Sequence, residues 1–111
     1  MVFKREIERK PDDFLALCQK HNVKLLYAFG SSVSDQFDET SSDIDLLVEI
    51  DEDDPLKRGS KLFSLWDLLE EFFQRKVDLL TDSSIKNPIL RKNIDKTKIL
   101  IYDRNGQKVL V

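Results

Sequence analysis

One stretch, residues 25–50, constrains the fold of this chain more than any other. An apolar run at its start indicates a strand, Gly30-Ser31 indicates a tight turn, and a polar loop leads to a second strand that carries Asp43 and Asp45. Because side chains alternate faces in an extended strand, both carboxylates project to the same face. Two such charges repel each other, so the pair indicates a cation between them, most simply a hard divalent ion with oxygen ligands.

The turn before these acids suits a phosphate group. Gly30 lets a backbone approach closely, and Ser31 offers a hydroxyl and an N–H at an expected helix start. Carboxylates that can bind a metal, next to a turn that can bind phosphate, indicate nucleotide chemistry. Simpler explanations stay open, since Gly30 could be a plain turn residue, Ser31 a helix cap, and the two acids a solvated entry to a strand.

Size and composition indicate an ordered domain. The 111 residues allow one domain over 1–111 with one hydrophobic core, and 41% apolar with 35% charged residues excludes a disordered chain. No run is long enough to cross a bilayer and the start lacks a signal peptide's apolar block, so we expect a cytoplasmic protein with no membrane segment. One cysteine, Cys18, and one histidine, His21, argue against a disulfide and a zinc site.

The net charge is −3, and acids cluster at residues 49–54. This charge argues against direct nucleic-acid binding and favours a small charged substrate or a protein partner.

The pattern of apolar residues predicts an α+β fold, a mixed sheet of about four strands with flanking helices. We expect residues 1–10 to be a frayed lead or a short first turn. The expected elements are a helix at 11–20, a strand at 24–29, a short helix at the start of 31–42, a strand at 44–50, a helix from Asp54-Pro55 to about 75, a strand at 76–81, short helical pieces around Pro88, a strand at 97–102, and a return from a turn at Asn105-Gly106 over 107–111.

Several conspicuous residues have structural interpretations. The stripe of the long helix predicts core packing and comprises Leu62, Leu65, Trp66, Leu69, Phe72 and Phe73. We interpret His21 as a surface or capping residue, Cys18 as buried and inert, and Tyr102 as sheet packing.

Gly30-Ser31, followed after residues 32–42 by Asp43-x-Asp45 and an apolar run, resembles the signature of the DNA polymerase β-type nucleotidyltransferase superfamily. The likeness extends to residues 76–81 around Asp78, to 87–91 and to 99–102, and it covers about 22–102. Residues 103–111 remain as a hairpin or tail. The short chain is similar to the minimal branch of the superfamily, whose small proteins are often paired with a HEPN-type ribonuclease toxin.

The resemblance implies roles for six residues. Asp43 and Asp45 would bind two Mg²⁺ ions, and Asp78 would complete the site, provided that its strand lies beside that of Asp45. The nucleotide-binding residues would be Gly30, Ser31 and Ser32. For Asp78 alone, an exposed strand acid is the structural alternative.

The resemblance also implies a reaction and a partner. The chain would transfer AMP from ATP, or a nucleotide from another nucleoside triphosphate, to a hydroxyl, most simply a tyrosine of a HEPN toxin, and would act as an antitoxin. A chain this short needs a partner or a second subunit, such as a homo-oligomer, to bring the acceptor. Two alternatives stay open, a non-catalytic antitoxin that acts by binding alone and nucleotidyl transfer to a small molecule.

The sequence departs from the pattern at one point. Many relatives carry an Arg shortly after the Gly-Ser pair, whereas residues 32–34 here are Ser-Val-Ser. A cation for the triphosphate must then come from elsewhere, and the candidates are Lys57, Arg58, Lys61 and Lys92.

Overall fold

The computed structural model describes residues 2–34, 43–106 and 108–109. In chain order its elements are α1 (Val2–Arg9), α2 (Pro11–Lys20), β1 (Val23–Ala28), the 3-10 helix η1 (Gly30–Val33), β2 (Ile44–Ile50), α3 (Pro55–Phe73), β3 (Val77–Thr81), the 3-10 helix η2 (Asp82–Ser84), α4 (Pro88–Thr97), β4 (Ile99–Asp103) and β5 (Lys108–Val109).

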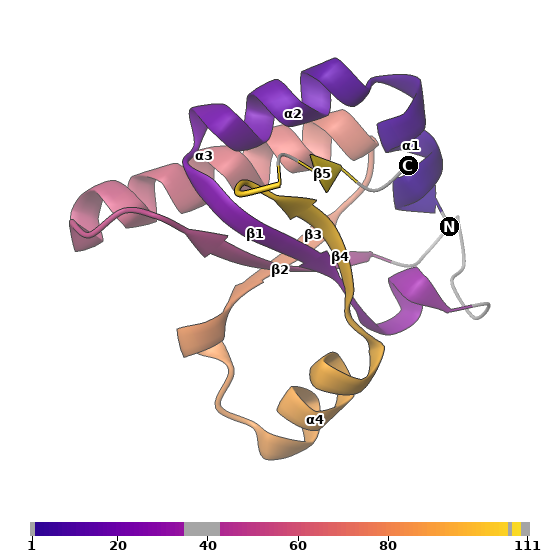
Figure 1. Cartoon of the computed structure of the whole chain (residues 1–111). Helices are drawn as coiled ribbons and strands as arrows, with labels where there is room; N and C mark the ends of the chain where they lie inside the picture. Colours follow the sequence, from indigo (N-terminus) through magenta and orange to yellow (C-terminus); the bar gives the residue numbers. More distant parts are fainter. Residues whose placement is uncertain (1, 35–42, 107, 110–111) are drawn as a thin grey trace.

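The strands of the described residues form one mixed sheet in the order β3-β2-β1-β4-β5 (Figure 1). β1 pairs antiparallel with β2 and with β4, whereas β2 and β3 run parallel. Two parallel neighbours cannot be joined by a tight hairpin, and here the long helix α3 makes the connection. The prediction of an α+β fold with about four strands is therefore confirmed by β1 to β4, and β5 adds a short fifth strand.

Most predicted boundaries agree with the structure. The strand predicted at residues 44–50 is β2 with the same bounds, and the strand predicted at 24–29 is β1, shifted by one residue. The turn at Asn105-Gly106 does return the chain, because β5 pairs antiparallel with β4. Of the predicted return segment, residues 107, 110 and 111 lie outside the described residues.

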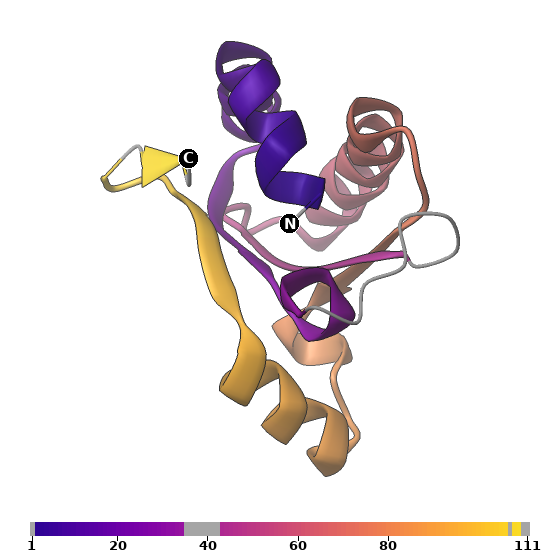
Figure 2. The ribbon, with the colours of Figure 1, turned by 90° about the vertical axis from the view of Figure 1, so that its right-hand side faces the viewer.

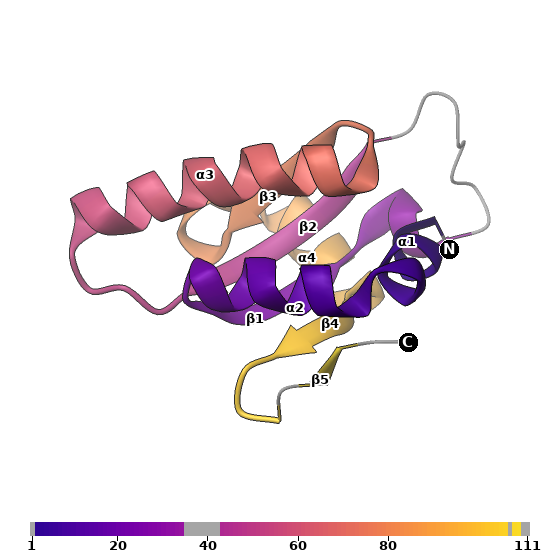
Figure 3. The same cartoon turned by 90° about the horizontal axis from the view of Figure 1, so that it is seen from above.

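Helices cover the two faces of the sheet unequally. The helices α1, α2 and α3 lie over one face and α4 lies on the other (Figure 2), and α2 and α3 run side by side (Figure 3). Ile44, Leu46 and Val48 point from β2 into the larger core with residues of α1, α2 and α3. A smaller core on the α4 side consists of Phe29, Leu47, Ile85 and Ile94.

The long helix α3 begins and packs as predicted. The carboxylate of Asp54 caps it by accepting the N–H of Leu56 at 3.0 Å, and Pro55 occupies the first turn. The predicted stripe is core, since Leu65, Leu69 and Phe73 are buried and its other members pack against them. Among the described residues, none of the helices combines the length and the hydrophobicity that a bilayer crossing requires.

The prediction of a frayed start was wrong, because residues 2–9 form α1. Its side chains Phe3 and Ile7 are 1% and 0% exposed. They stand four residues apart, hence on one face of the helix, and they join the larger core beneath α2 and α3. The burial of these two side chains outweighs the weak local signal of a short, highly charged segment.

His21 is not on the surface, although the alternative prediction of a capping role is confirmed. It is the C-cap of α2 and only 3% exposed. Its Nδ1 lies 2.8 Å from the Leu17 carbonyl, which can only accept, so Nδ1 donates; in the neutral ring Nε2 then accepts from the Ser64 hydroxyl at 2.9 Å. Cys18 and Tyr102 are buried as predicted, and burial raises the pKa of the Cys18 thiol to about 12.

Candidate functional site

The acids at the proposed site come from two neighbouring strands. Asp45 of β2 and Asp78 of β3 are register partners in the parallel pair. Their side chains therefore leave the sheet on the same face, because partners in a ladder share the pleat. This is the face that carries α4, since the alternate residues Ile44 and Leu46 enter the core on the other side. The sequence-based condition that the strand of Asp78 lie beside that of Asp45 is met.

Asp43 belongs to the same surroundings. It stands two residues before Asp45, immediately ahead of β2, and is exposed, as is Asp78. The pKa of Asp45 is raised from 3.8 to about 6, first by burial, then by the negative charge of Asp78 and then by that of Asp43. The charges of Asp43 and Asp78 thus both act on Asp45, and a cation placed among the three carboxylates would relieve the repulsion at Asp45.

The donor chemistry fits a hard cation such as Mg²⁺, since all three groups offer carboxylate oxygens. Even so, within residues 2–34, 43–106 and 108–109 no group of three His, Cys, Asp or Glu side chains is already gathered closely enough to hold a metal. The backbone positions of the acids are in place, whereas their side chains do not form a closed cage.

Helix α3 fixes the start of the Asp78 strand. The indole Nε1 of Trp66 donates to the Val77 carbonyl at 2.7 Å, and Glu70 accepts the Val77 N–H at 2.9 Å. Trp66 and Glu70 stand one helical turn apart, so together they hold both backbone polar groups of Val77. Because Val77 directly precedes Asp78, these contacts hold the backbone that presents the carboxylate.

The turn at Gly30 lies against the acids. Gly30 has a φ of +64°, and a Cβ at this position would stand 2.9 Å from Oδ2 of Asp45. Its N–H donates to Oγ1 of Thr97, at the end of α4, at 3.1 Å. The predicted short helix exists as η1, but the Gly30 N–H is already bonded to the protein and is not directed at a phosphate.

Ser32 contacts the acid strand directly. Its side chain is buried, and its Oγ accepts the N–H of Asp45 at 2.8 Å. This hydroxyl therefore helps to position Asp45, and contact of Ser31 or Ser32 with a nucleotide stays a prediction. Residues 35–42 of the following loop, including Ser42, lie outside the described residues.

A groove of about 650 Å³ lies beside the second half of β2, and none of the three acids is part of its lining. Leu47 lines it and is the next residue of β2 on the face of Asp45, and Tyr27 lies opposite Leu47 on β1. Thr81 at the end of β3, Arg58 of α3 and Lys98 after α4 contribute further walls. The lining of the groove combines apolar and charged residues.

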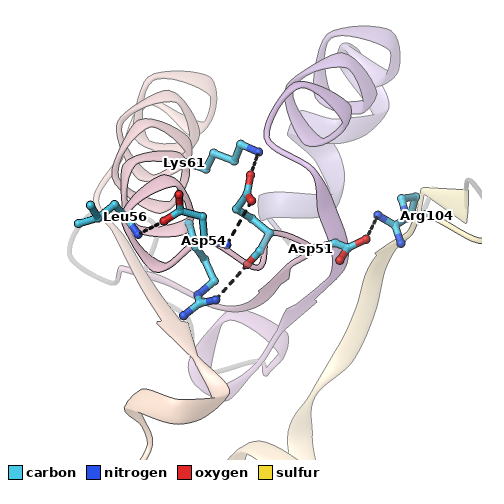
Figure 4. A network of polar contacts seen from close by, with 7 residues as sticks. Asp51, Asp54, Leu56, Lys61 and Arg104 are labelled. Atoms are coloured by element: carbon cyan, nitrogen blue, oxygen red, sulfur yellow. Dashed lines mark hydrogen bonds and ion pairs between the residues drawn. The ribbon is translucent and has the colours of Figure 1, made fainter.

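The predicted triphosphate cations are partly engaged elsewhere. At the start of α3, Lys61 pairs with Glu52 at 2.6 Å, and Figure 4 also shows Arg104, directly after β4, paired with Asp51 at 2.8 Å. Arg58 donates to the Glu52 carbonyl at 3.0 Å, while Lys57 and Lys92 are exposed.

Sequence reasoning missed Lys98. Its ammonium lies 4.9 Å from the centre of the Tyr27 ring, in the wall of the groove. No local signal distinguishes it from other lysines, because its ring partner is on a distant strand.

Comparisons with known proteins agree with this arrangement. The family model described as polymerase beta, nucleotidyltransferase matches residues 14–107. A protein of Methanocaldococcus jannaschii, named as a protein adenylyltransferase, is 37% identical over 97 residues, which cover 87% of this chain and 93% of that protein.

Solved structures share the fold. A minimal nucleotidyltransferase is 25% identical with a TM-score of 0.60, covering 86% of this chain and 93% of that one. A chain in the complex of a tri-AMPylated Shewanella oneidensis HEPN toxin with an MNT antitoxin is 20% identical with a TM-score of 0.51, covering 96% of this chain and 76% of that one. The resemblance seen in the sequence is confirmed by the match over residues 14–107, and this chain belongs to the polymerase beta nucleotidyltransferase family.

Proposed function

We propose that this nucleotidyltransferase moves AMP from ATP to a hydroxyl group in a magnesium-dependent reaction. The observation that carries the proposal is the pairing of Asp45 with Asp78 on neighbouring strands, with Asp43 acting on the same carboxylate. Asp43 and Asp78 repel the negative charge of Asp45, a bound cation would relieve this repulsion, and a nucleotide brings divalent cations with it.

Asp43, Asp45 and Asp78 would hold two Mg²⁺ ions. Bound there, the ions would neutralise the charge that develops on the attacking and leaving oxygens during displacement at phosphorus. In the reaction, the acceptor oxygen bonds to the α-phosphorus, the bond to pyrophosphate breaks, and the hydroxyl proton leaves. Asp78 is exposed at the outer strand β3, where an arriving hydroxyl can reach it, and it would help to orient that hydroxyl or accept its proton.

The acceptor is a tyrosine hydroxyl of a HEPN-type toxin, and the chain acts as its antitoxin in the cytoplasm. Support comes from the fold shared with a chain of the complex between an AMPylated HEPN toxin and an MNT antitoxin. It comes also from the relative named as a protein adenylyltransferase. The exposure of Asp43 and Asp78 leaves room for a partner to bring the hydroxyl to these acids.

The test is transfer of radiolabel from α-labelled ATP to the HEPN protein encoded beside this chain, with Mg²⁺ present. We expect label on the toxin, its loss with Tyr→Phe at the modified position, and its loss with EDTA. The variant Asp43→Asn with Asp45→Asn should abolish transfer, whereas Asp53→Asn, an exposed acid outside the site, should not.

The same experiment separates the alternatives. Label transfer that survives the double Asp→Asn variant would refute the assigned site. Toxin inhibition that persists in EDTA without any label on the toxin would support an antitoxin that acts by binding alone. Label recovered only in a small product would support transfer to a small molecule.

A further inference from the structure

The groove beside the second half of β2 is lined by a lysine that has no role in the reaction proposed above. Lys98 follows Thr97, whose Oγ1 accepts the N–H of Gly30, and a Cβ on Gly30 would touch Asp45. This chain of contacts places the backbone of Lys98 close to the Gly30 turn and to Asp45. Its ammonium stands over the Tyr27 ring, 4.9 Å from the ring centre.

A nucleoside triphosphate would bring several negative charges to a site that already has three carboxylates. Bound Mg²⁺ ions would compensate only part of this charge, so a protein cation close to the phosphates is needed. The Gly30 turn does not provide one, since uncharged residues occupy positions 31–34. Of the described residues that line the groove, Arg58 and Lys98 carry a positive charge.

Position favours Lys98 over Arg58. Arg58 belongs to the first turns of α3, beyond the far end of β2, and its guanidinium donates to the Glu52 carbonyl. Lys98 instead directly follows Thr97, which bonds the Gly30 turn next to Asp45.

We propose that Lys98 binds the phosphate chain of the nucleotide and takes the place of the arginine that is missing after Ser31. The inference rests on the proposed function, because it assumes that the acids receive a nucleoside triphosphate. A lysine suits the role, since its ammonium offers three donors to phosphate oxygens from any direction.

The neighbouring side chains position the Lys98 ammonium and leave it able to bind a phosphate. The face of the Tyr27 ring attracts a cation and limits where the ammonium stands. The other partner is Asp95, 3.6 Å away, and the two side chains are 36% and 55% exposed. Such an exposed ion pair contributes little free energy, so a phosphate can replace Asp95 at small cost.

The test compares two ligands in equilibrium titrations with Mg²⁺, ATP and inorganic tripolyphosphate. We expect Lys98→Met to weaken the binding of both by roughly 10- to 100-fold, the loss typical of one charge-assisted contact. Lys98→Arg should retain most of the affinity. The matched control is Lys96→Met, which removes the same charge from an exposed position in the last turn of α4.

Each other outcome is decisive. Unchanged affinity for both ligands in Lys98→Met would overturn the proposed role of Lys98. A loss of affinity for ATP but not for tripolyphosphate would also overturn it, because the lysine would then contact the nucleoside and not the phosphates. An equal loss of affinity in Lys96→Met would overturn it as well, because the effect would then come from the change in net charge and not from the position of Lys98. If the unmodified protein binds neither ligand, the proposed function fails together with this inference. Thermal unfolding of each variant verifies that the fold is retained.

Discussion

Gly30 and Asp45 approach each other so closely that only a glycine leaves the carboxylate where it stands. A Cβ on Gly30 would lie 2.9 Å from Oδ2 of Asp45, shorter than a van der Waals contact, and the φ of +64° also disfavours any other residue. The tight turn that the sequence indicates is therefore part of the wall around the acid. Close approach of a backbone to a carboxylate, rather than to a phosphate, is the role of this glycine that the geometry shows.

We therefore expect Gly30→Ala to displace the Asp45 side chain and to weaken Mg²⁺-dependent ATP binding at least tenfold. The positive φ should lower the free energy of unfolding by about 1 kcal/mol. Gly59→Ala is the control, because a Cβ there meets nothing within 4 Å and the site is helical. That variant should gain roughly 0.5–1 kcal/mol in urea unfolding. Equal ATP affinity in Gly30→Ala and the unmodified protein would contradict the expectation.

Asp45 should make the metal-free protein less stable as the pH rises. The pKa of Asp45 is raised from its ordinary value of 3.8 to about 6 in the folded chain, so between these pH values the folded state binds the proton more tightly than the unfolded state does. The contribution favourable to folding is complete below pH 3.8 and is lost as the pH rises through about 6.

Urea unfolding in EDTA should therefore show Asp45→Asn to be more stable than the unmodified protein at pH 7.5, by about 1–2 kcal/mol after a discount for its partial exposure. At pH 4 the gain should be nearly absent. Mg²⁺ affinity should fall as the pH is lowered through 6, because the ion requires the ionised carboxylate. A gain of the same size at both pH values would disprove the assignment of the shift to Asp45.

The hydrogen bond between the buried ring of His21 and the Ser64 hydroxyl should stabilise the packing of α2 on α3. We expect His21→Ala to lower the free energy of unfolding by about 1–3 kcal/mol, because it removes two hydrogen bonds and a buried ring. Ser64→Ala should cost about 1 kcal/mol. The double variant should cost clearly less than the sum. Ser60→Ala, exposed one turn earlier on α3, is the control, and strictly additive effects would show that the pair is not coupled.

Helix α1 should be an integral part of the core. Ile7→Ala and Phe3→Ala each remove a buried side chain, and each should cost about 2–5 kcal/mol in denaturant unfolding. Glu8→Ala, which alters an exposed side chain of the same helix, should change stability by less than about 0.5 kcal/mol. If all three variants unfold at the same urea concentration, α1 does not contribute to the core in solution.

The elements with strong local signals could be predicted from the sequence. The strand Ile44–Ile50 contains the apolar run 46–48, and the helix after it has a capping Asp54, Pro55 in its first turn and an apolar stripe. Such signals act over a few residues, so they do not depend on the rest of the fold. The motif around Asp43 and Asp45 belongs to the same class, since its two acids share a face through strand geometry alone.

What the tertiary structure decided is which distant residues meet. Asp78 reaches Asp45 because α3 spans the sheet and returns the chain parallel to β2, and Lys98 reaches Tyr27 because β4 pairs with β1. His21 and α1 become buried only through packing against α3 and the core, which neither segment's local pattern announces. The sequence by itself determined the chemistry available to this protein, because residue types and short-range periodicity are local properties. The tertiary structure decided the position of that chemistry, because contacts across the sheet depend on strand order and register.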